Sequence, residues 1–229
     1  MNTDVEEPFR VAVYYAPTAD DPLFAASTNW LGRDPVTNAP ARQPDAPDIA
    51  AITDDPRLYG FHATLKPPMR LRHAWDDFLA AAISMSKTIK PFDLPPLGVM
   101  DLHGFLALRE TQPSAALQHL SDVCVEQLDA FRQPSSPEEL ARRRRSPLTA
   151  EQDAMLVRWG YPYVFETWFF HLTLTRRLTP LEKALYMPRA EAHFAGAINC
   201  PRRVVDICLF TQRIPGAPFT IAERLPLGG

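Results

Sequence analysis

The stretches of this chain that decide its fold read Phe61-His62-Ala63-Thr64-Leu65 and Phe170-His171-Leu172-Thr173-Leu174. Both follow the pattern Phe-His-x-Thr-Leu, and a little under half of the chain separates them. In an extended strand successive side chains point to opposite faces, so each histidine shares a face with the threonine two residues later. Each stretch, called a His word below, therefore predicts a strand that offers one imidazole and one hydroxyl.

Two His words that face one cleft would bring His62 and His171 together, with Thr64 and Thr173 beside them. One imidazole can then accept a proton while the other donates one, and the hydroxyls are neutral hydrogen-bond donors. This set suits in-line chemistry on a phosphodiester. A single strand histidine is more often an ordinary core or surface residue, but the repetition favours a catalytic pair with phosphate-binding threonines.

The words His62-Ala63-Thr64-Leu65 and His171-Leu172-Thr173-Leu174 resemble the paired His-Φ-Ser/Thr-Φ signature, with Φ apolar, of the two-histidine (2H) phosphoesterase superfamily. The wider stretches 59–68 and 168–175 look like the branch of that superfamily known as phosphonate metabolism proteins. The resemblance implies a bilobal, pseudo-symmetric α+β fold. Each lobe would be an antiparallel sheet with helices packed outside, and the motif strands would face a central cleft.

Bulk composition narrows the class of protein. The chain has 229 residues, of which 46% are hydrophobic, enough for one sizeable domain or two fused lobes. A net charge of -3 and a pI near 6.1 argue against a protein that coats nucleic acid. The acidic start, residues 1–7, lacks a secretory signal, and no apolar run is long enough to span a bilayer. We expect a soluble, cytoplasmic protein that does not associate with membranes.

The apolar pattern predicts alternating strands and helices. Strands are expected at 10–15, 61–66, 97–101, 105–109, 164–175, 204–213 and 219–225. Helices are expected at 22–31, 75–89, 115–131 and 180–194 and after the caps Ser136 and Thr149, with an irregular loop at 32–55. The order of elements after each His word is alike, as internal duplication requires. We expect a single bilobal domain over 1–229, with lobes at about 8–111 and 112–227.

Further side chains lie near the His words. Alternation puts Lys66 on the face of His62, where its ammonium would bind a substrate phosphate; the alternative is a strand-end lysine in solvent. Thr175 holds the equivalent position in the second word, and one of Arg176 and Arg177 is expected to reach the cleft. Three other residues would contact the substrate unless they only serve packing: Arg57, Tyr59 and Tyr163.

The basic run Arg142-Arg143-Arg144-Arg145 suggests nucleic acid, but it ends a short helix, where positive side chains oppose the negative end of the helix dipole. A solvated helix terminus is the favoured interpretation. The remaining histidines and the three cysteines lack metal-ligand spacing, so we expect free thiols and neither metal nor cofactor.

These observations favour a metal-independent phosphodiesterase with two-histidine acid-base catalysis, its roles not yet assigned to His62 or His171. The resemblance implies cyclic substrates: 2',3'-cyclic phosphates of RNA ends or nucleotides, or a phosphonate-derived cyclic sugar phosphate. Two alternatives stay open, a non-catalytic binder of nucleotides or phosphorylated metabolites and an RNA-end ligase or binder. Only the latter requires the run at Arg142 to line the cleft. We expect a monomer.

Overall fold

A four-stranded antiparallel sheet joins the two ends of the chain. In the computed structural model, which describes residues 7–228, its strands lie in the order β2-β1-β8-β9. They are β1 (Arg10–Tyr15), β2 (Ala63–Met69), β8 (Asp206–Gln212) and β9 (Thr220–Pro226). A three-stranded antiparallel sheet, in the order β4-β5-β6, comprises β4 (Leu97–Leu102), β5 (Phe105–Glu110) and β6 (Leu172–Thr173). The short strands β3 (Phe92–Leu94) and β7 (Arg202–Val204) pair with each other. The predicted α+β class with antiparallel sheets is confirmed.

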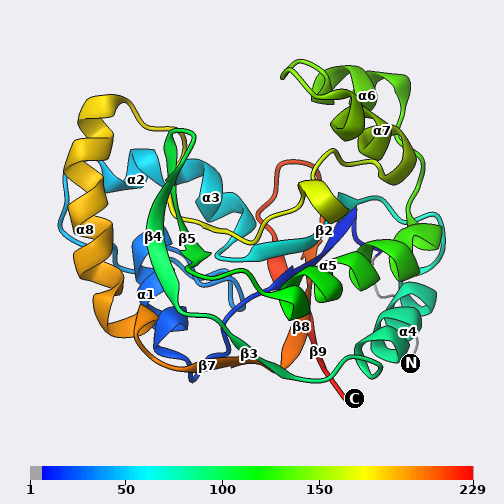
Figure 1. Ribbon diagram of the computed structural model, residues 1–229, viewed down its shortest axis with the longest axis horizontal. Helices are drawn as coiled ribbons and strands as arrows, with labels where there is room; N and C mark the ends of the chain where they lie inside the picture. Colours follow the sequence, from blue (N-terminus) through cyan, green and yellow to red (C-terminus); the bar gives the residue numbers. More distant parts are fainter. Residues whose placement is uncertain (1–6, 229) are drawn as a thin grey trace.

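Helices flank these sheets, as Figure 1 shows. α8 packs against α1 and β4 at one end of the molecule, while α5 packs on β2 and α4 on α5 and β9 at the other. α6 and α7 project from the body above α5. The bounds are α1 (Pro22–Leu31), α2 (Ile49–Ile52), α3 (Asp54–Tyr59), α4 (Trp75–Ser86), α5 (Ala115–Leu128), α6 (Pro137–Arg143), α7 (Ala150–Trp159) and α8 (Pro180–Ile198). Across residues 7–228, none of these helices combines the length and apolar character that a membrane crossing requires.

The predicted helix starts agree with the structure. The Asp21 carboxylate accepts a hydrogen bond from Leu23 N at 2.8 Å and caps α1. Complete capping boxes begin α6, α7 and α8 at Ser136, Thr149 and Thr179. In each box the cap side chain and the residue three positions later satisfy backbone N–H groups that no helical carbonyl reaches. Residues 1–6, most of the acidic start, lie outside the described residues.

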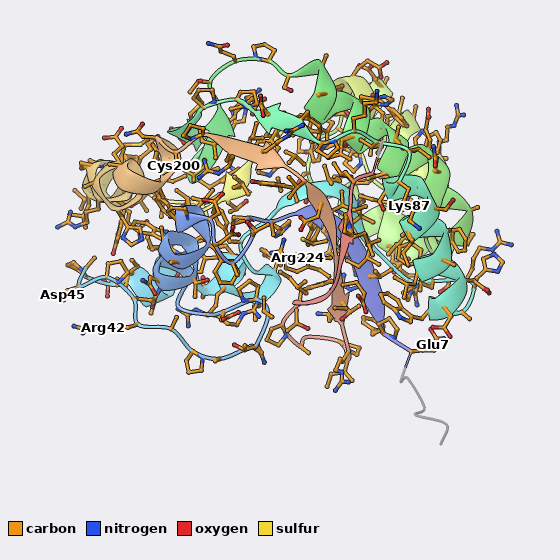
Figure 2. The ribbon with its side chains drawn as sticks, turned by 90° about the horizontal axis from the view of Figure 1, so that it is seen from below. Glu7, Arg42, Asp45, Lys87, Cys200 and Arg224 are labelled. Carbon is orange, nitrogen blue, oxygen red and sulfur yellow. The ribbon has the colours of Figure 1, made fainter. Side chains whose placement is uncertain are left out.

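The order of elements after the two His words is the same, as predicted. The first word continues as β2-α4-β3-β4-β5 and the second as β6-α8-β7-β8-β9. The sheets nevertheless combine the halves, because the first-half hairpin β4-β5 pairs with β6 while the second-half hairpin β8-β9 pairs with β1. On β9, Arg224 (labelled in Figure 2) bonds to Asp206 at 3.3 Å and to the carbonyl of Pro17 at 2.7 Å. Both of these sheets therefore take strands from both sides of the expected lobe boundary at 111/112.

Two segments differ from expectation. The predicted strand 164–175 contains a turn of 3-10 helix at Phe165–Thr167 and pairs only at Leu172–Thr173. The ladder ends there because the Thr175 hydroxyl, in place of a backbone carbonyl, accepts the N–H of Leu106 at 3.0 Å. The predicted loop 32–55 contains α2 and the start of α3.

Candidate active site

Each His word sits at the start of its strand. His62 precedes β2 and His171 precedes β6, and both are half-buried. The preceding residues, Phe61 and Phe170, are 3% and 0% exposed and belong to the hydrophobic core. The predicted alternation therefore holds at this point, because the phenylalanines anchor the words in the core while the histidines face away from it.

The two imidazoles are held in the same way. His62 Nδ1 lies 2.9 Å from the carbonyl oxygen of Gly60, and His171 Nδ1 lies 3.1 Å from that of Phe169. A carbonyl oxygen can only accept, so each Nδ1 carries the proton and the Nε2 of each neutral ring is unprotonated. The Nε2 of His62 lies 3.3 Å from the hydroxyl of Thr64. The shared bond to the residue two positions earlier prepares both rings to exchange a proton at Nε2.

Aromatic side chains enclose the rings. Tyr14 stacks on His62 with ring centroids 3.6 Å apart, and Tyr59 meets the same ring edge-on at 6.3 Å. Phe169 stacks on His171 at 4.7 Å. This burial lowers the pKa of His62 to about 3, and the charge of the nearby His171 acts in the same direction. Burial also lowers the pKa of His171. Both rings are therefore neutral at pH 7 in the free protein.

Gly60 supplies the carbonyl that orients His62, and its φ of 75° lies in the left-handed region that favours glycine. A Cβ added there would lie 3.0 Å from Pro35 Cβ and 3.3 Å from an Arg33 nitrogen. We expect Gly60→Ala to lower the free energy of unfolding by about 1–2 kcal/mol and to reduce kcat about tenfold, because the displaced carbonyl misplaces His62. Urea denaturation and steady-state kinetics measure the two effects.

Gly216→Ala is the matched control, since Gly216 has a φ of 81° but no atom within 4 Å of an added Cβ. In the free energy of unfolding it should show the backbone penalty alone. Equal kcat in Gly60→Ala and the wild type would contradict the orienting role of this carbonyl.

A cavity of about 500 Å³ adjoins His171 and Thr64. The tip of the β4-β5 hairpin contributes His103 and Phe105, and Arg177 lies beside this tip, where its guanidinium donates to the carbonyl of His103. Its other lining residues are Pro147, Gln152, Tyr161, Tyr163, Thr167, Trp168 and Phe169. This cavity is called the histidine cleft below. The indole of Trp168 fixes the two words relative to each other, because its Nε1 donates to the carbonyl of Thr64 at 2.8 Å.

The prediction that Lys66 faces the cleft is wrong. Tyr14 pairs with Thr64 and Val13 with Lys66, so two residues of β2 oppose one of β1 in a bulge at Leu65. The bulge reverses the alternation, and Lys66 turns into the protein with 1% exposure. Its ammonium donates to Asp129 Oδ1 at 3.0 Å and to the carbonyl of Val125 at 3.2 Å. Lys66 is a buried structural cation.

Two other predicted contacts also have structural roles. Thr175 is 1% exposed and uses its hydroxyl on β5, as described above. The guanidinium of Arg57 donates to the carbonyl of Leu31 at 2.9 Å and to Gln43 Oε1 at 3.3 Å. The bonds of Arg57 hold the segment before the first His word, and neither Thr175 nor Arg57 lines the histidine cleft.

The remaining predicted residues divide by position. Tyr163 and Arg177 line the histidine cleft, whereas Arg176 pairs with Glu182 at 2.9 Å. Tyr59 contacts the His62 ring, as described above. Thr173 is half-buried on β6, where it pairs with Ala107, and it is not among the lining residues.

Sequence reasoning missed Phe105, Tyr161, Gln152 and the hairpin-tip contribution of His103 as cleft residues. The available signal was the short gap between the predicted strands 97–101 and 105–109, where His103 has a φ of 53° and the turn brings the tip back to the second word. The backbone N–H of Leu178 donates to the carbonyl of Gly104 at 2.7 Å.

The basic run ends α6 and does not line the histidine cleft. Arg144 pairs with Asp153 at 2.6 Å, and the guanidinium of Arg143 lies 4.8 Å from the ring centroid of Tyr161. Arg142 and Arg143 line a neighbouring hollow. The RNA-end ligase or binder alternative required this run to line the cleft, and the run does not line it. In the part of the chain that the structure describes, no three His, Cys, Asp or Glu side chains gather as a metal site would require.

Comparisons place these features among known proteins. A family model described as "Protein of unknown function (DUF1045)" matches residues 64–220. A protein of Janthinobacterium sp. (strain Marseille) named ribose 1,5-bisphosphate phosphokinase PhnN is 37% identical over 231 residues, 96% of this chain and 51% of its own length. Its namesake from Laribacter hongkongensis (strain HLHK9) is 33% identical over 222 residues, 93% of this chain and 51% of its own. The chain thus spans about half the length of the curated relatives it matches.

Solved structures with a similar chain path include a crystal structure titled phosphoesterase, with a TM-score of 0.46 and 15% identity. It covers 97% of this chain and 100% of its own. Another is E. coli LigT complexed with 3'-AMP, with a TM-score of 0.45, 14% identity and coverage of 97% and 99%.

Proposed function

The chain belongs to the DUF1045 family, and from the geometry of its histidine cleft we propose that it is a metal-independent phosphodiesterase that hydrolyses a cyclic phosphodiester with His62 and His171. The observation that carries the proposal is the equivalent hydrogen bonding of the two imidazoles, of which His171 lines the cleft while the Nε2 of His62 lies beside Thr64, a lining residue. Each donates from Nδ1 to the carbonyl two residues earlier, which leaves Nε2 as the unprotonated nitrogen. The resemblance of the His words to those of the 2H phosphoesterases supports the same chemistry.

In the proposed reaction one imidazole takes a proton from a water molecule at Nε2 as the water attacks phosphorus. The other, protonated at Nε2, gives its proton to the ring oxygen that leaves, so one P–O bond forms and one breaks. The histidines end with their protonation states exchanged, and proton exchange with solvent restores them. Which of His62 and His171 acts as the base is left open by the symmetry of the two arrangements.

Negative charge that develops on the non-bridging oxygens needs hydrogen-bond donors. Thr64 lies beside His62, and Arg177 and Tyr163 line the cleft. We assign phosphate binding to Thr64 and Arg177, with Thr173 as the counterpart of Thr64 on the second strand. Arg177 takes the phosphate-binding role that strand alternation predicted for Lys66.

Among cyclic substrates, a cyclic sugar phosphate is favoured over an RNA end. The relatives are named for action on ribose 1,5-bisphosphate, and the chain corresponds to about half of each. Hydrolysis of ribose 5-phosphate 1,2-cyclic phosphate at the bond from phosphorus to O2 would produce that bisphosphate. The chain contains no GxxxxGK[ST] sequence, with which P-loop enzymes hold nucleotide phosphates, so the kinase activity in the relatives' name is not part of the proposal.

The proposal is tested by incubating the protein, with EDTA present, with 2',3'-cyclic nucleotides, RNA ending in a cyclic phosphate, and ribose 1,2-cyclic phosphate with and without a 5-phosphate. Phosphorus NMR identifies the ring-opened monoester. We expect turnover of the cyclic sugar phosphates that persists in EDTA. Unchanged substrates after long incubation, together with saturable binding, would favour the non-catalytic alternative.

The pH optimum of kcat/KM should be more acidic than that of a catalytic pair of histidines with ordinary pKa values. One ring must be protonated and the other neutral, and burial lowers the pKa of both. We therefore expect kcat/KM to peak below about pH 6.5 and to fall about tenfold per pH unit on the alkaline side. An optimum above pH 7.5 would contradict the lowered pKa values of the two enclosed rings.

Arg109→Gln is the companion variant for this profile. The positive charge of Arg109 contributes to the lowered pKa of His171. Its removal should raise that pKa and move the alkaline limb to higher pH if His171 is the group that loses its proton there.

A further inference from the structure

A second hollow lies beside the histidine cleft, between the start of β1 and the end of α6. Its volume is about 700 Å³, and four guanidinium groups and one carboxylate line it: Arg10, Arg70, Arg142, Arg143 and Glu139. Arg10 comes from β1, Arg70 follows β2, and the other two arginines end α6. Three segments far apart in sequence thus bring their positive charges to one place. The basic run of α6 is therefore not simply a solvated helix terminus.

The carboxylate of Glu139 already has hydrogen-bonding partners within the protein. Glu139 Oε1 lies 3.1 Å from Arg70, and Glu139 Oε2 accepts the backbone N–H of Ser136 at 2.9 Å to complete the capping box. Among residues 7–228, Arg10, Arg142 and Arg143 have no carboxylate oxygen within 4.0 Å. Like charges that crowd together without counter-ions destabilise a fold, so an arrangement of this kind is typical of a site for an anion.

Arg10 shows this crowding. Its side chain is half-buried, and Nε donates to Gln212 Oε1 at 2.8 Å, a neutral partner that fixes the guanidinium without neutralising it. Burial lowers the pKa of Arg10, and the charges of Arg142 and Arg143 lower it further.

The hollow adjoins the histidine cleft. Tyr163 lines both, and Tyr161, which lines the cleft, lies beneath the guanidinium of Arg143. On β1, Arg10 shares a face with Tyr14, whose ring stacks on His62. Four residues of strand span roughly 13 Å, and the arginine side chain shortens that distance. A molecule with two phosphate groups can reach both sites.

We propose that this hollow is a second anion site, which binds a phosphomonoester on the same small molecule whose cyclic phosphate lies in the histidine cleft. The inference rests on the proposed function and adds a requirement for a second phosphate. A phosphomonoester dianion suits several planar guanidinium groups, each able to donate two parallel hydrogen bonds. The arginines converge on one hollow and do not follow a groove, which favours a terminal phosphate on a small molecule over an RNA backbone.

Matched substrates test the requirement: ribose 1,2-cyclic phosphate with and without a 5-phosphate. The double variant Arg142→Gln/Arg143→Gln should lose about 10²-fold in kcat/KM on the substrate with the 5-phosphate, as expected when charge-assisted hydrogen bonds are removed. On the substrate without it, the change should stay within about twofold. Arg145→Gln is the control, because Arg145 belongs to the same run but is exposed and does not line the hollow.

The proposal is overturned if the wild type hydrolyses both sugars equally well, or if Arg145→Gln has the same effect as the double variant. Better turnover of an RNA cyclic end than of the sugar 5-phosphate, lost in the same double variant, would reassign the hollow to an RNA backbone.

Binding of ribose 5-phosphate, measured by calorimetry, separates this inference from the proposed function. Binding by the wild type and by His62→Ala, lost in Arg142→Gln/Arg143→Gln, would support the second site even if no cyclic substrate turned over. Turnover of ribose 1,2-cyclic phosphate without any binding of ribose 5-phosphate would leave the phosphodiesterase standing and remove the second anion site.

Discussion

His62→Ala and His171→Ala should each lower kcat on a cyclic sugar phosphate by at least about 10²-fold, the contribution of one general acid or base. The double variant should be little slower than either single variant, because the imidazoles act as one proton-exchanging unit. Initial rates with EDTA present, followed by phosphorus NMR, measure the loss. The equivalent orientation of the rings by Gly60 and Phe169 is the reason to expect similar losses at the two positions.

His119→Ala is the control, since His119 is exposed on α5 and takes no part in the cleft. Folding must be compared as well. Because the pKa of His62 is lowered in the folded protein, the unfolded chain binds more protons below about pH 6.5, and the wild type loses stability there as pH falls towards 3. His62→Ala should reduce this acid sensitivity. Full activity of either histidine variant would contradict the proposed mechanism.

Asp129→Ala should lower the free energy of unfolding by about 3 kcal/mol, because it removes the partner of a buried charge. The Lys66 ammonium, 1% exposed, would keep only the carbonyl of Val125 as an acceptor. The bridge from Arg132 to Asp129, with N–O distances of 2.8 and 3.0 Å, would also be lost. Urea denaturation measures the change.

Lys66→Met is the matched variant. It removes the buried cation while keeping much of the side-chain volume, and Asp129 retains Arg132, so we expect a smaller loss of stability than in Asp129→Ala. Its kcat/KM should stay within about threefold of the wild type, since Lys66 does not face the cleft. A loss near 10²-fold would restore the phosphate-binding role that strand alternation predicted.

How far the sequence predicts the site depends on the range of the interactions. The orientation of Phe61, His62 and Thr64 follows from local alternation, and it is correct. Two residues later the prediction for Lys66 fails, because the bulge at Leu65 arises from pairing with β1, which lies about fifty residues earlier in the chain. Register with a distant partner leaves no signal in the local pattern.

The second word shows the same limit. Phe170 and His171 face as predicted, but the strand is short because the Thr175 side chain replaces a backbone acceptor. The helix starts were predictable, since a cap and its third residue interact within one turn. The basic hollow was not, because Arg10 and Arg142 meet only in the folded protein.

The pairing of β1 with β8 also sets the time at which folding can finish. Val11 lies opposite Thr211, so the two partners are 200 residues apart. At about 5–20 residues per second, a ribosome needs on the order of 10–40 s to make the intervening chain. During that interval one edge of β1 has no partner strand. This strand contains the apolar sequence Val11-Ala12-Val13, which is buried in the folded protein. Unpaired apolar edges invite aggregation, so nascent chains of this topology should depend on chaperones until the β8-β9 hairpin emerges.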